Sequence, residues 1–263
     1  MIEYLVVAVV ALLASGLTMF SGFGLGTILL PVFALFVPVD LAIAATAVVH
    51  AANNVLKASL LGRLADWRVV VRFGVPAILA ALAGAWLLSV VAQMPEWGRY
   101  DLYGFEAVLT PLNLVIAGLM VGFAVLELAP RFDDLAFDER YLPIGGVLSG
   151  FFGGLSGHQG ALRSAFLAKT DITAQAFVGT NAVIGLAVDL VRIVVYGLVV
   201  FGSRLSAVVA GSDGGLILVG SLAAFGGVLL GRAYLHKVTM TLIRRLTGVL
   251  LLVIALLLGS GLI

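Results

Sequence analysis

The polar residues that could do chemistry in this chain gather in three places, and the first is a single apolar run. Thr46, His50, Asn53, Asn54 and Lys57 lie within this run. At about 100° per residue they share an arc of roughly 100° on a helix. A polar stripe inside a membrane helix must face a partner helix or a wet cavity. The stripe is therefore a candidate binding site, and the structural alternative is helix adhesion with a lysine that reaches toward the helix end.

The second place is a glycine-rich segment, Ser156-Gly157-His158-Gln159-Gly160, which is followed by Arg163. It repeats, in altered form, residues 21–26, and we name these the second and the first glycine segments. A short helix that starts inside a membrane points free N–H groups and its positive end at whatever lies there. Arginine or histidine adds charge-assisted donors, so the pattern favours a small anion. For any single glycine, close helix packing is the alternative explanation.

A third set of polar residues lies on a later run, where Asp189 and Arg192 are spaced to form an ion pair. That pair is as consistent with a structural role as with a functional one. The candidate substrate-binding residues are Ser21, Gly22, Gly24, Gly26, Thr46, His50, Asn53, Asn54, Ser156, Gly157, His158, Gln159, Arg163, Thr180 and Asn181. The candidates for coupling to protons are His50, His158, Asp189, Arg192 and Lys57. The two histidines are included because histidine is the side chain whose ordinary pKa lies near neutrality.

The composition places these residues in a membrane protein. The chain is 62% hydrophobic and 11% charged, whereas soluble domains carry about 25% charged residues. Zero cysteines exclude disulfides, thiolate metal sites and thiol catalysis. Neither a Walker A sequence nor a zinc-protease or Gly-x-Ser-x-Gly motif is present. We therefore expect no cofactor, no metal, no nucleic-acid partner and no enzymatic activity. The N-terminus lacks a basic stretch, which favours a retained helix over a cleaved signal peptide.

The elements that position the stripe and the glycine segments follow from the apolar runs. Expected helices cover residues 2–20, 27–37, 41–61, 69–91, 112–128, 142–155, 161–168, 173–201, 214–235 and 246–263. The runs 27–37 and 161–168 are too short to span a bilayer. Each glycine segment could therefore form a re-entrant hairpin or join two short crossings. Residues 93–110 are expected to form an interfacial loop with aromatic anchors.

The same pattern of runs occurs twice, which predicts an all-α polytopic membrane protein of two halves. Residues 1–128 form the first transmembrane repeat, 129–141 a polar cytoplasmic linker and 142–263 the second repeat. Each repeat would contain one broken or re-entrant helix pair and about three full transmembrane helices. Apolar segments interrupted by glycine at matching places in two halves are typical of a transporter's binding site.

Basic residues indicate how the two halves are oriented. The first half carries Arg63, Arg68 and Arg72 in one connection, and the second half carries Arg232, Lys237, Arg244 and Arg245 in a different one. Positive clusters mark the cytoplasmic side of a membrane. Equivalent loops would then lie on opposite faces, so the halves are expected to have inverted topology, with both termini outside.

These motifs resemble the sulfite exporter TauE/SafE family over nearly the whole chain. The resemblance rests on residues 21–26, on Ala44-Ala45-Thr46 and on the spacing from Thr46 to Asn53. The second half departs from the family pattern, with His158-Gln159 where further glycine is usual. The resemblance implies export or uptake of small sulfur-containing anions across the bacterial inner membrane.

The functional expectation is a secondary transporter of a small sulfur-containing anion, such as sulfite or an organosulfonate, that works by alternating access. Arg163, His50, Asn53 and Asn54 would donate to the anion. A passive anion channel of the same architecture is the alternative, and an intramembrane enzyme or a structural subunit is a third. Expected partners are the small anionic solute and the lipid bilayer, with a second copy of the chain as a candidate.

Overall fold

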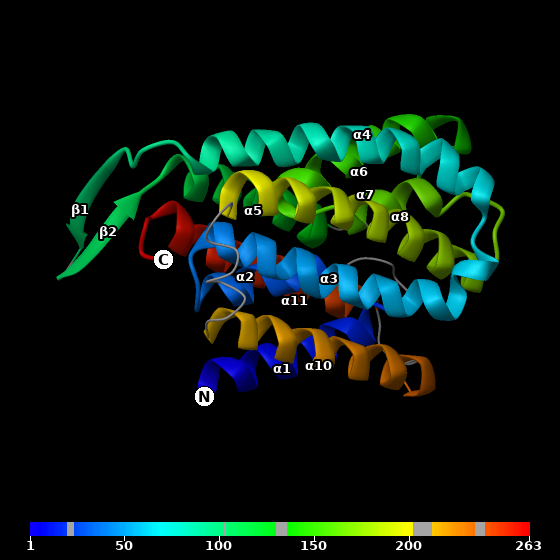
Figure 1. Cartoon of the computed structure of the whole chain (residues 1–263), viewed down its shortest axis with the longest axis horizontal. Coiled ribbons are helices and arrows are strands. Elements are labelled where there is room, and N and C mark those ends of the chain that lie inside the picture. Colours follow the sequence, from blue (N-terminus) through cyan, green and yellow to red (C-terminus); the bar gives the residue numbers. More distant parts are fainter. Residues whose placement is uncertain (20–23, 103, 130–135, 202–211, 235–239) are drawn as a thin grey trace.

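The protein is a bundle of helices aligned with its long axis, with a two-stranded sheet projecting from one end (Figure 1). The computed structural model describes residues 1–19, 24–102, 104–129, 136–201, 212–234 and 240–263. The helices are α1 (Ile2–Leu17), α2 (Leu25–Ala34), α3 (Val39–Leu61), α4 (Trp67–Ala92), α5 (Pro111–Leu128), α6 (Leu142–Ser156), α7 (Gly160–Leu167), α8 (Ala174–Val195), α10 (Ser212–Tyr234) and α11 (Met240–Gly259). Short turns η1 (Gly62–Leu64), η3 (Glu139–Tyr141) and η4 (Tyr196–Phe201) adjoin them.

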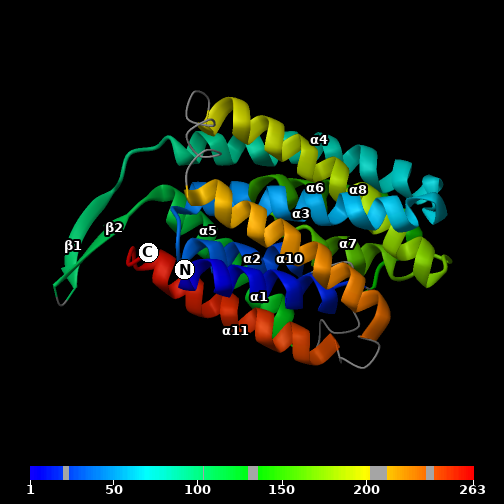
Figure 2. The ribbon, with the colours of Figure 1, turned by 60° about the horizontal axis from the view of Figure 1, so that its bottom comes forward.

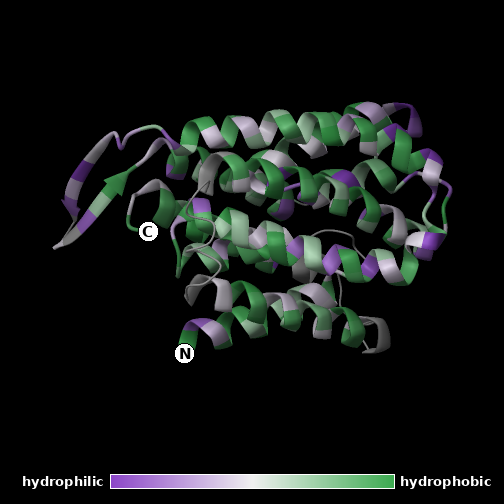
Figure 3. Cartoon of the chain, viewed as in Figure 1, coloured by the Kyte–Doolittle hydropathy of each residue, from purple (hydrophilic) through white to green (hydrophobic). Residues whose placement is uncertain are grey.

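In the described part of the chain, five helices are long and apolar enough to cross a membrane. They cover Val39–Leu64, Trp67–Ala92, Pro111–Leu128, Ala174–Leu198 and Gly214–Gly231. Hydrophilic residues gather in the β hairpin at one end of the bundle and in the α3–α4 turn at the other, while the long helices are mainly hydrophobic (Figure 3). The expected all-α polytopic membrane fold is thus confirmed.

Several helices begin where the sequence supplies a side-chain cap. Asp66 accepts a hydrogen bond from Val69 N at the start of α4, and Thr173 accepts one from Ala176 N at the start of α8. Thr110 caps α5, whose first residue is Pro111. Such caps satisfy backbone donors that a helix start leaves free, and proline suits the first helical position. The turns between the long helices are therefore fixed locally by sequence.

The two glycine segments are where helices break within the bundle. Gly24, before α2, has φ of 108°, and Gly157, after α6, has φ of 83°, a left-handed conformation that suits glycine. Helix α2 has 10 residues and α7 has 8, which is about 15 and 12 Å at 1.5 Å per residue. Neither can span a hydrocarbon core of about 30 Å.

Each short helix returns to the end of the bundle from which its partner helix came. Phe137 N, just before α6, donates to Ala165 O near the end of α7 at 3.2 Å. The start of α1 and the α2–α3 junction also lie together at one end (Figures 1 and 2). The pairs α1–α2 and α6–α7 are therefore re-entrant, which decides between the two arrangements that the sequence left open.

Close backbone contact through glycine joins two pairs of parallel helices. A Cβ on Gly150 or Gly154 of α6 would overlap the backbone of Ala77 or Ala81 of α4. Glycines of α10 contact α1 in the same manner, with Gly227 against Leu12 O and Gly231 against Gly16. Both pairs use small residues four positions apart, which let membrane helices approach closely.

Two other helix pairs are antiparallel. In α8, Gly179 packs against Leu61 near the end of α3, whereas Gly185 packs against Asn54, nearer its middle. In α11, Gly248 packs against Leu128 and Gly259 against Ala117 of α5. If α1–α5 are exchanged in order with α6, α7, α8, α10 and α11, the pairs α3–α8 and α5–α11 are each unchanged. The pair α4–α6 then becomes the pair α10–α1. Inverted repeats and the boundaries at 1–128, 129–141 and 142–263 stay predictions.

The basic residues of the two halves meet at one end of the molecule. Arg68 at the start of α4 lies 3.5 Å from Glu139, and Arg244 of α11 lies 3.1 Å from Glu127 of α5. Lys237 and Arg204 lie outside the described residues, and the Arg232 side chain is not described either. The α3–α4 turn, the start of α6 and the start of α11 share one end (Figure 2), which we call the arginine-rich end.

The opposite end carries a feature that the sequence did not predict. The expected loop at residues 93–110 contains strands β1 (Gly98–Leu102) and β2 (Phe105–Leu109), which pair antiparallel. Tyr100 donates to Ser260 O at 2.5 Å, and Val108 N donates to Gly261 O at 2.9 Å, so the hairpin holds the C-terminus. Hydrogen bonds from Arg99 also keep the pKa of Glu96 below its ordinary value. The aromatic residues of the hairpin are typical of membrane anchors, and for this reason the sequence predicted an interfacial loop and no strands.

Candidate functional site

Helix α3 lies in the middle of the molecule and carries the polar stripe. It is the most buried of the five described spans. Thr46, His50, Asn53, Asn54 and Lys57 are all buried. The lysine does not reach the surface near the helix end, since its side chain is only 6% exposed. These side chains therefore meet partner helices or an internal cavity.

Across from the stripe, Asp189 of α8 is fully buried and brings several elements together. Its Oδ2 lies 2.6 Å from His50 Nδ1 and accepts a 2.9 Å hydrogen bond from Asn54. Its Oδ1 accepts a 3.0 Å bond from Gln159 Nε2 and lies 3.1 Å from Arg192 Nη2. One carboxylate thus links α3, the start of α7 and α8. The ion pair expected between positions 189 and 192 is present.

A second set of hydrogen bonds holds Arg163 of α7. Its Nε donates to Asn181 Oδ1 at 2.7 Å, and its Nη1 donates to Gln159 Oε1 at 2.8 Å. Gly185 makes room for this packing, because a Cβ there would lie 2.7 Å from Asn54 Nδ2 and 3.1 Å from Arg163 Nη1. The second glycine segment and α8 therefore fix the guanidinium inside the protein.

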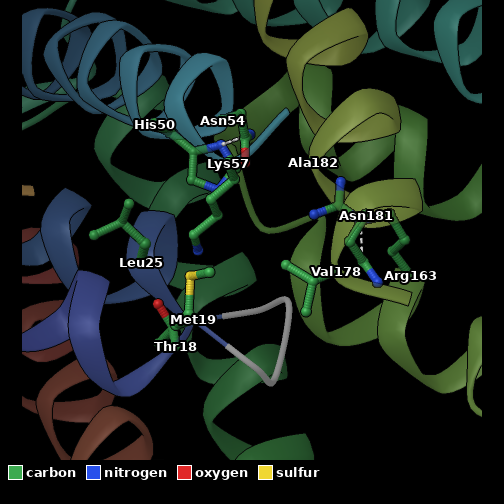
Figure 4. A pocket seen from close by; sticks show the side chains of 10 residues that line it. All are labelled: Thr18, Met19, Leu25, His50, Asn54, Lys57, Arg163, Val178, Asn181 and Ala182. Carbon is green, nitrogen blue, oxygen red and sulfur yellow. Dashed lines mark hydrogen bonds between the residues drawn. The ribbon is translucent and has the colours of Figure 1, made fainter. Parts of the chain in front are cut away.

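These residues border a small cavity between α1, α2, α3, α7 and α8 (Figure 4). Its volume is about 10 Å³, close to the minimum that one water molecule needs. Lys57 enters from α3, while Arg163 and Asn181 lie on the other side. No described residue forms a hydrogen bond or ion pair with the Lys57 amine. The lining residues are Thr18, Met19, Leu25, His50, Asn54, Lys57, Arg163, Val178, Asn181 and Ala182.

The buried charges around the cavity do not balance. Lys57 and Arg163 are buried cations that line it, and Asp189, the described carboxylate beside it, is already paired with Arg192. A buried charge without a partner is costly in a low-dielectric interior. Charged side chains inside a membrane protein mark substrate or ion pathways. Within the described residues, the middle of the bundle is therefore a site that favours an anion.

Several predicted residues lie beside the cavity rather than on it. Gly26, near the start of α2, packs against the second glycine segment, since a Cβ there would lie 3.3 Å from Gly157 O and 3.6 Å from His50 Cδ2. Thr46 Cγ2 would lie 3.9 Å from the same Cβ. Gly24 provides the left-handed turn before α2. Gly26 and Gly157 therefore pack together next to the polar stripe.

Other predicted residues point elsewhere. Asn53 accepts a 2.7 Å hydrogen bond from Ser15 of α1 and so faces away from the cavity. His158 stacks on Phe123 of α5 at 4.8 Å between ring centroids, and its Nδ1 lies 2.9 Å from Ser156 Oγ.

Three further candidates lie apart or cannot be placed. Thr180 accepts a 2.9 Å bond from Asp66 N at the α3–α4 turn. Ser21 and Gly22 lie outside the described residues.

Sequence reasoning did not find five of the lining residues. Met19, Leu25, Val178 and Ala182 are apolar, and nothing in their pattern separates them from ordinary core residues. Thr18 lies three positions before the first glycine segment, and that proximity was the available signal.

Buried cations around a central cavity, in a bundle with several membrane-spanning helices, define a multi-pass membrane protein with an internal polar site. The chain belongs to the sulfite exporter TauE/SafE family, whose model matches residues 7–258. The family is one of membrane transporters for sulfite and related anions. No curated protein and no solved structure matches the chain.

Proposed function

We propose that this protein is a secondary transporter of a small sulfur-containing anion, such as sulfite or an organosulfonate, in the bacterial inner membrane. The observation that carries the proposal is the excess of buried positive charge at the cavity. Lys57 and Arg163 line the cavity, whereas Asp189, the buried carboxylate beside it, is paired with Arg192. An oxyanion between Lys57 and Arg163 would compensate this charge through charge-assisted hydrogen bonds.

The bound anion would take donors from three helices. Lys57 and Asn54 belong to α3, Arg163 to α7 and Asn181 to α8. The start of α2 adds backbone N–H groups near the cavity, and a helix start favours negative charge. Because the donors come from both halves, relative movement of the halves would change the site.

The small size of the cavity supports alternating access over a passive channel. On the side of the arginine-rich end, Met19, Val178 and Val228 form a small apolar cluster. The main core packs around the other side. The described residues leave space for about one water molecule, so an anion could enter only after the helices move. The symmetry of the helix pairs supports inverted repeats as the moving units.

Proton coupling would depend on the Asp189 network. His50 and Asp189 are in contact at 2.6 Å, and both lie next to the cavity lined by Lys57 and Arg163. A proton taken up by this pair would change the charge that the anion meets. A homodimer stays a prediction.

Sulfite flux into proteoliposomes tests the transport mode. Purified protein should accumulate radiolabelled sulfite above the external concentration when a proton gradient is imposed, and the accumulation should collapse when a protonophore is added. Flux that only equalises the concentrations, with or without the gradient, would contradict the transporter and favour the channel.

A further inference from the structure

We propose a second anion-binding site at Arg192, separate from the cavity lined by Arg163 and Lys57. This inference builds on the proposed transport of small oxyanions and adds a second position on their path. Arg192 is fully buried, and none of its three guanidinium nitrogens has a hydrogen-bond partner within the described residues. Its one ion-pair contact is Nη2 to Asp189 Oδ1 at 3.1 Å.

Other polar atoms without hydrogen-bond partners surround the same region. His158 Nε2 and Thr46 Oγ1 are buried without a hydrogen-bond partner in the described part of the chain. A Cβ on Gly157, the residue before His158, would overlap Arg192 Nη1, and the Gly157 carbonyl packs against Gly26 and thereby approaches Thr46. An imidazole, a guanidinium and a hydroxyl thus lie near the contact between Gly26 and Gly157. Buried polar groups normally have partners, and an oxyanion with several acceptor oxygens fits the guanidinium and hydroxyl donors.

The two sites lie at different depths along α8. The Arg163 guanidinium of the first cavity packs against Gly185 of α8, and Arg192 is seven residues further, which corresponds to about 10 Å along a helix. Asp189 lies between them and is held by His50, Asn54 and Gln159. A carboxylate at this place separates two cationic positions and opposes an anion that rests between them. An anion would therefore bind on either side of Asp189 in turn.

The outer boundary of the second site is the hydroxyl of Tyr196, one turn beyond Arg192. This side chain is buried and donates to Gly154 O of α6. Tyr196 thus bounds the second site toward the hairpin, and the cluster of Met19, Val178 and Val228 packs beside the first cavity toward the arginine-rich end. Packed side chains at the outer side of each position suit a path that opens to one side at a time.

Equilibrium binding of radiolabelled sulfite to the purified full chain tests this proposal. The parent protein should bind two sulfite ions per chain. Arg192→Gln should lose one of them and keep the other, and Arg163→Gln should do the reverse. One ion per chain in the parent, retained at full affinity in Arg192→Gln, would overturn the second site and leave the proposed function standing. Absence of binding in the folded parent would overturn both.

A second variant keeps the test informative if Arg192→Gln does not fold. Thr46→Val removes an unpartnered hydroxyl and preserves the side-chain shape, so it should leave the melting temperature equal or higher. It should weaken sulfite binding at the second site several-fold and leave the affinity of the first site unchanged. Two unchanged affinities in this variant would count against the site. Ser59→Ala is the control, because its exposed hydroxyl on α3 only donates to Leu56 O.

Discussion

Asn53 and Asn54 are neighbours in sequence, yet the structure gives them different surroundings. Asn53 bonds Ser15 of α1, whereas Asn54 donates to Asp189 and lines the cavity. Successive residues on a helix are 100° apart, so one polar stripe can face two neighbours. At the scale of the residue, burial alone therefore does not identify a ligand, and the direction of each amide decides its role.

This difference predicts distinct effects of two adjacent substitutions. Asn53→Ala should lower stability on the order of 0.6 kcal/mol, as for other interhelical hydrogen bonds in membranes, and should keep the rise in melting temperature that sulfite produces. Asn54→Ala should lose most of that rise, because it removes a donor at the site. Thermal-shift measurements with and without sulfite check both. Equal sulfite-induced shifts in the two variants would contradict the assignment.

The sequence identified the residue types of the site but not their arrangement. His50, Lys57, Arg163 and Asn181 could be found because polar side chains are rare in apolar runs. Their convergence could not be found, since the partner of His50 lies 139 positions away. Thr180 has the same polar character as Asn181, and only the fold shows that it bonds the α3–α4 turn instead.

At the scale of the element, glycine has two separate tasks in this molecule. Gly24 and Gly157 adopt positive φ and end or begin helices inside the bundle. Gly150 and Gly154 are helical and bring α6 against the backbone of α4. The sequence showed where the short helices lie, because 8 to 10 residues cannot span a bilayer. It did not show the β hairpin, whose five-residue strands give a weak signal.

Valine substitutions distinguish a glycine of α6 that packs against another helix from a glycine of α5 that has space for a larger side chain. Gly154→Val should lower the free energy of unfolding by about 1–3 kcal/mol through overpacking, since its Cβ would overlap Ala81 O of α4. Gly118→Val in α5 is the matched control, because its Cβ would meet nothing within 4 Å. Melting temperatures of both variants in detergent provide the measurement. A Gly154→Val protein as stable as the control would show that α4 and α6 are not in backbone contact.

At the scale of the whole molecule, the two ends of the bundle differ in charge. Arg68 and Arg244 lie at one end with their acidic partners, and the β hairpin with Asp101 lies at the other. Because basic residues mark the cytoplasmic side, the hairpin should face outward. The basic clusters in the sequence carry this prediction, although they could not show that both short helix pairs are re-entrant.

Single cysteines test that orientation directly, since the chain has none of its own. In intact cells an impermeant thiol reagent should label Asp101→Cys and leave Arg68→Cys unlabelled until the membrane is permeabilised. Both positions are exposed in the structure, so access to each depends on the membrane alone. Labelling of both variants in intact cells would contradict the proposed orientation.

The most direct test of the central claim is the affinity of the purified protein for sulfite when the cavity cations are removed. Lys57→Met and Arg163→Gln should each weaken sulfite binding at the first site by roughly ten- to more than a hundredfold, the equivalent of about 1.5–3 kcal/mol for one charge-assisted hydrogen bond. Lys57→Met should melt at the same temperature as the parent or higher, because the buried amine has no hydrogen-bond partner among the described residues. Arg140→Gln, at an exposed position, should bind like the parent. Unchanged sulfite affinity in folded Lys57→Met and Arg163→Gln would contradict the assignment of this cavity as the anion site.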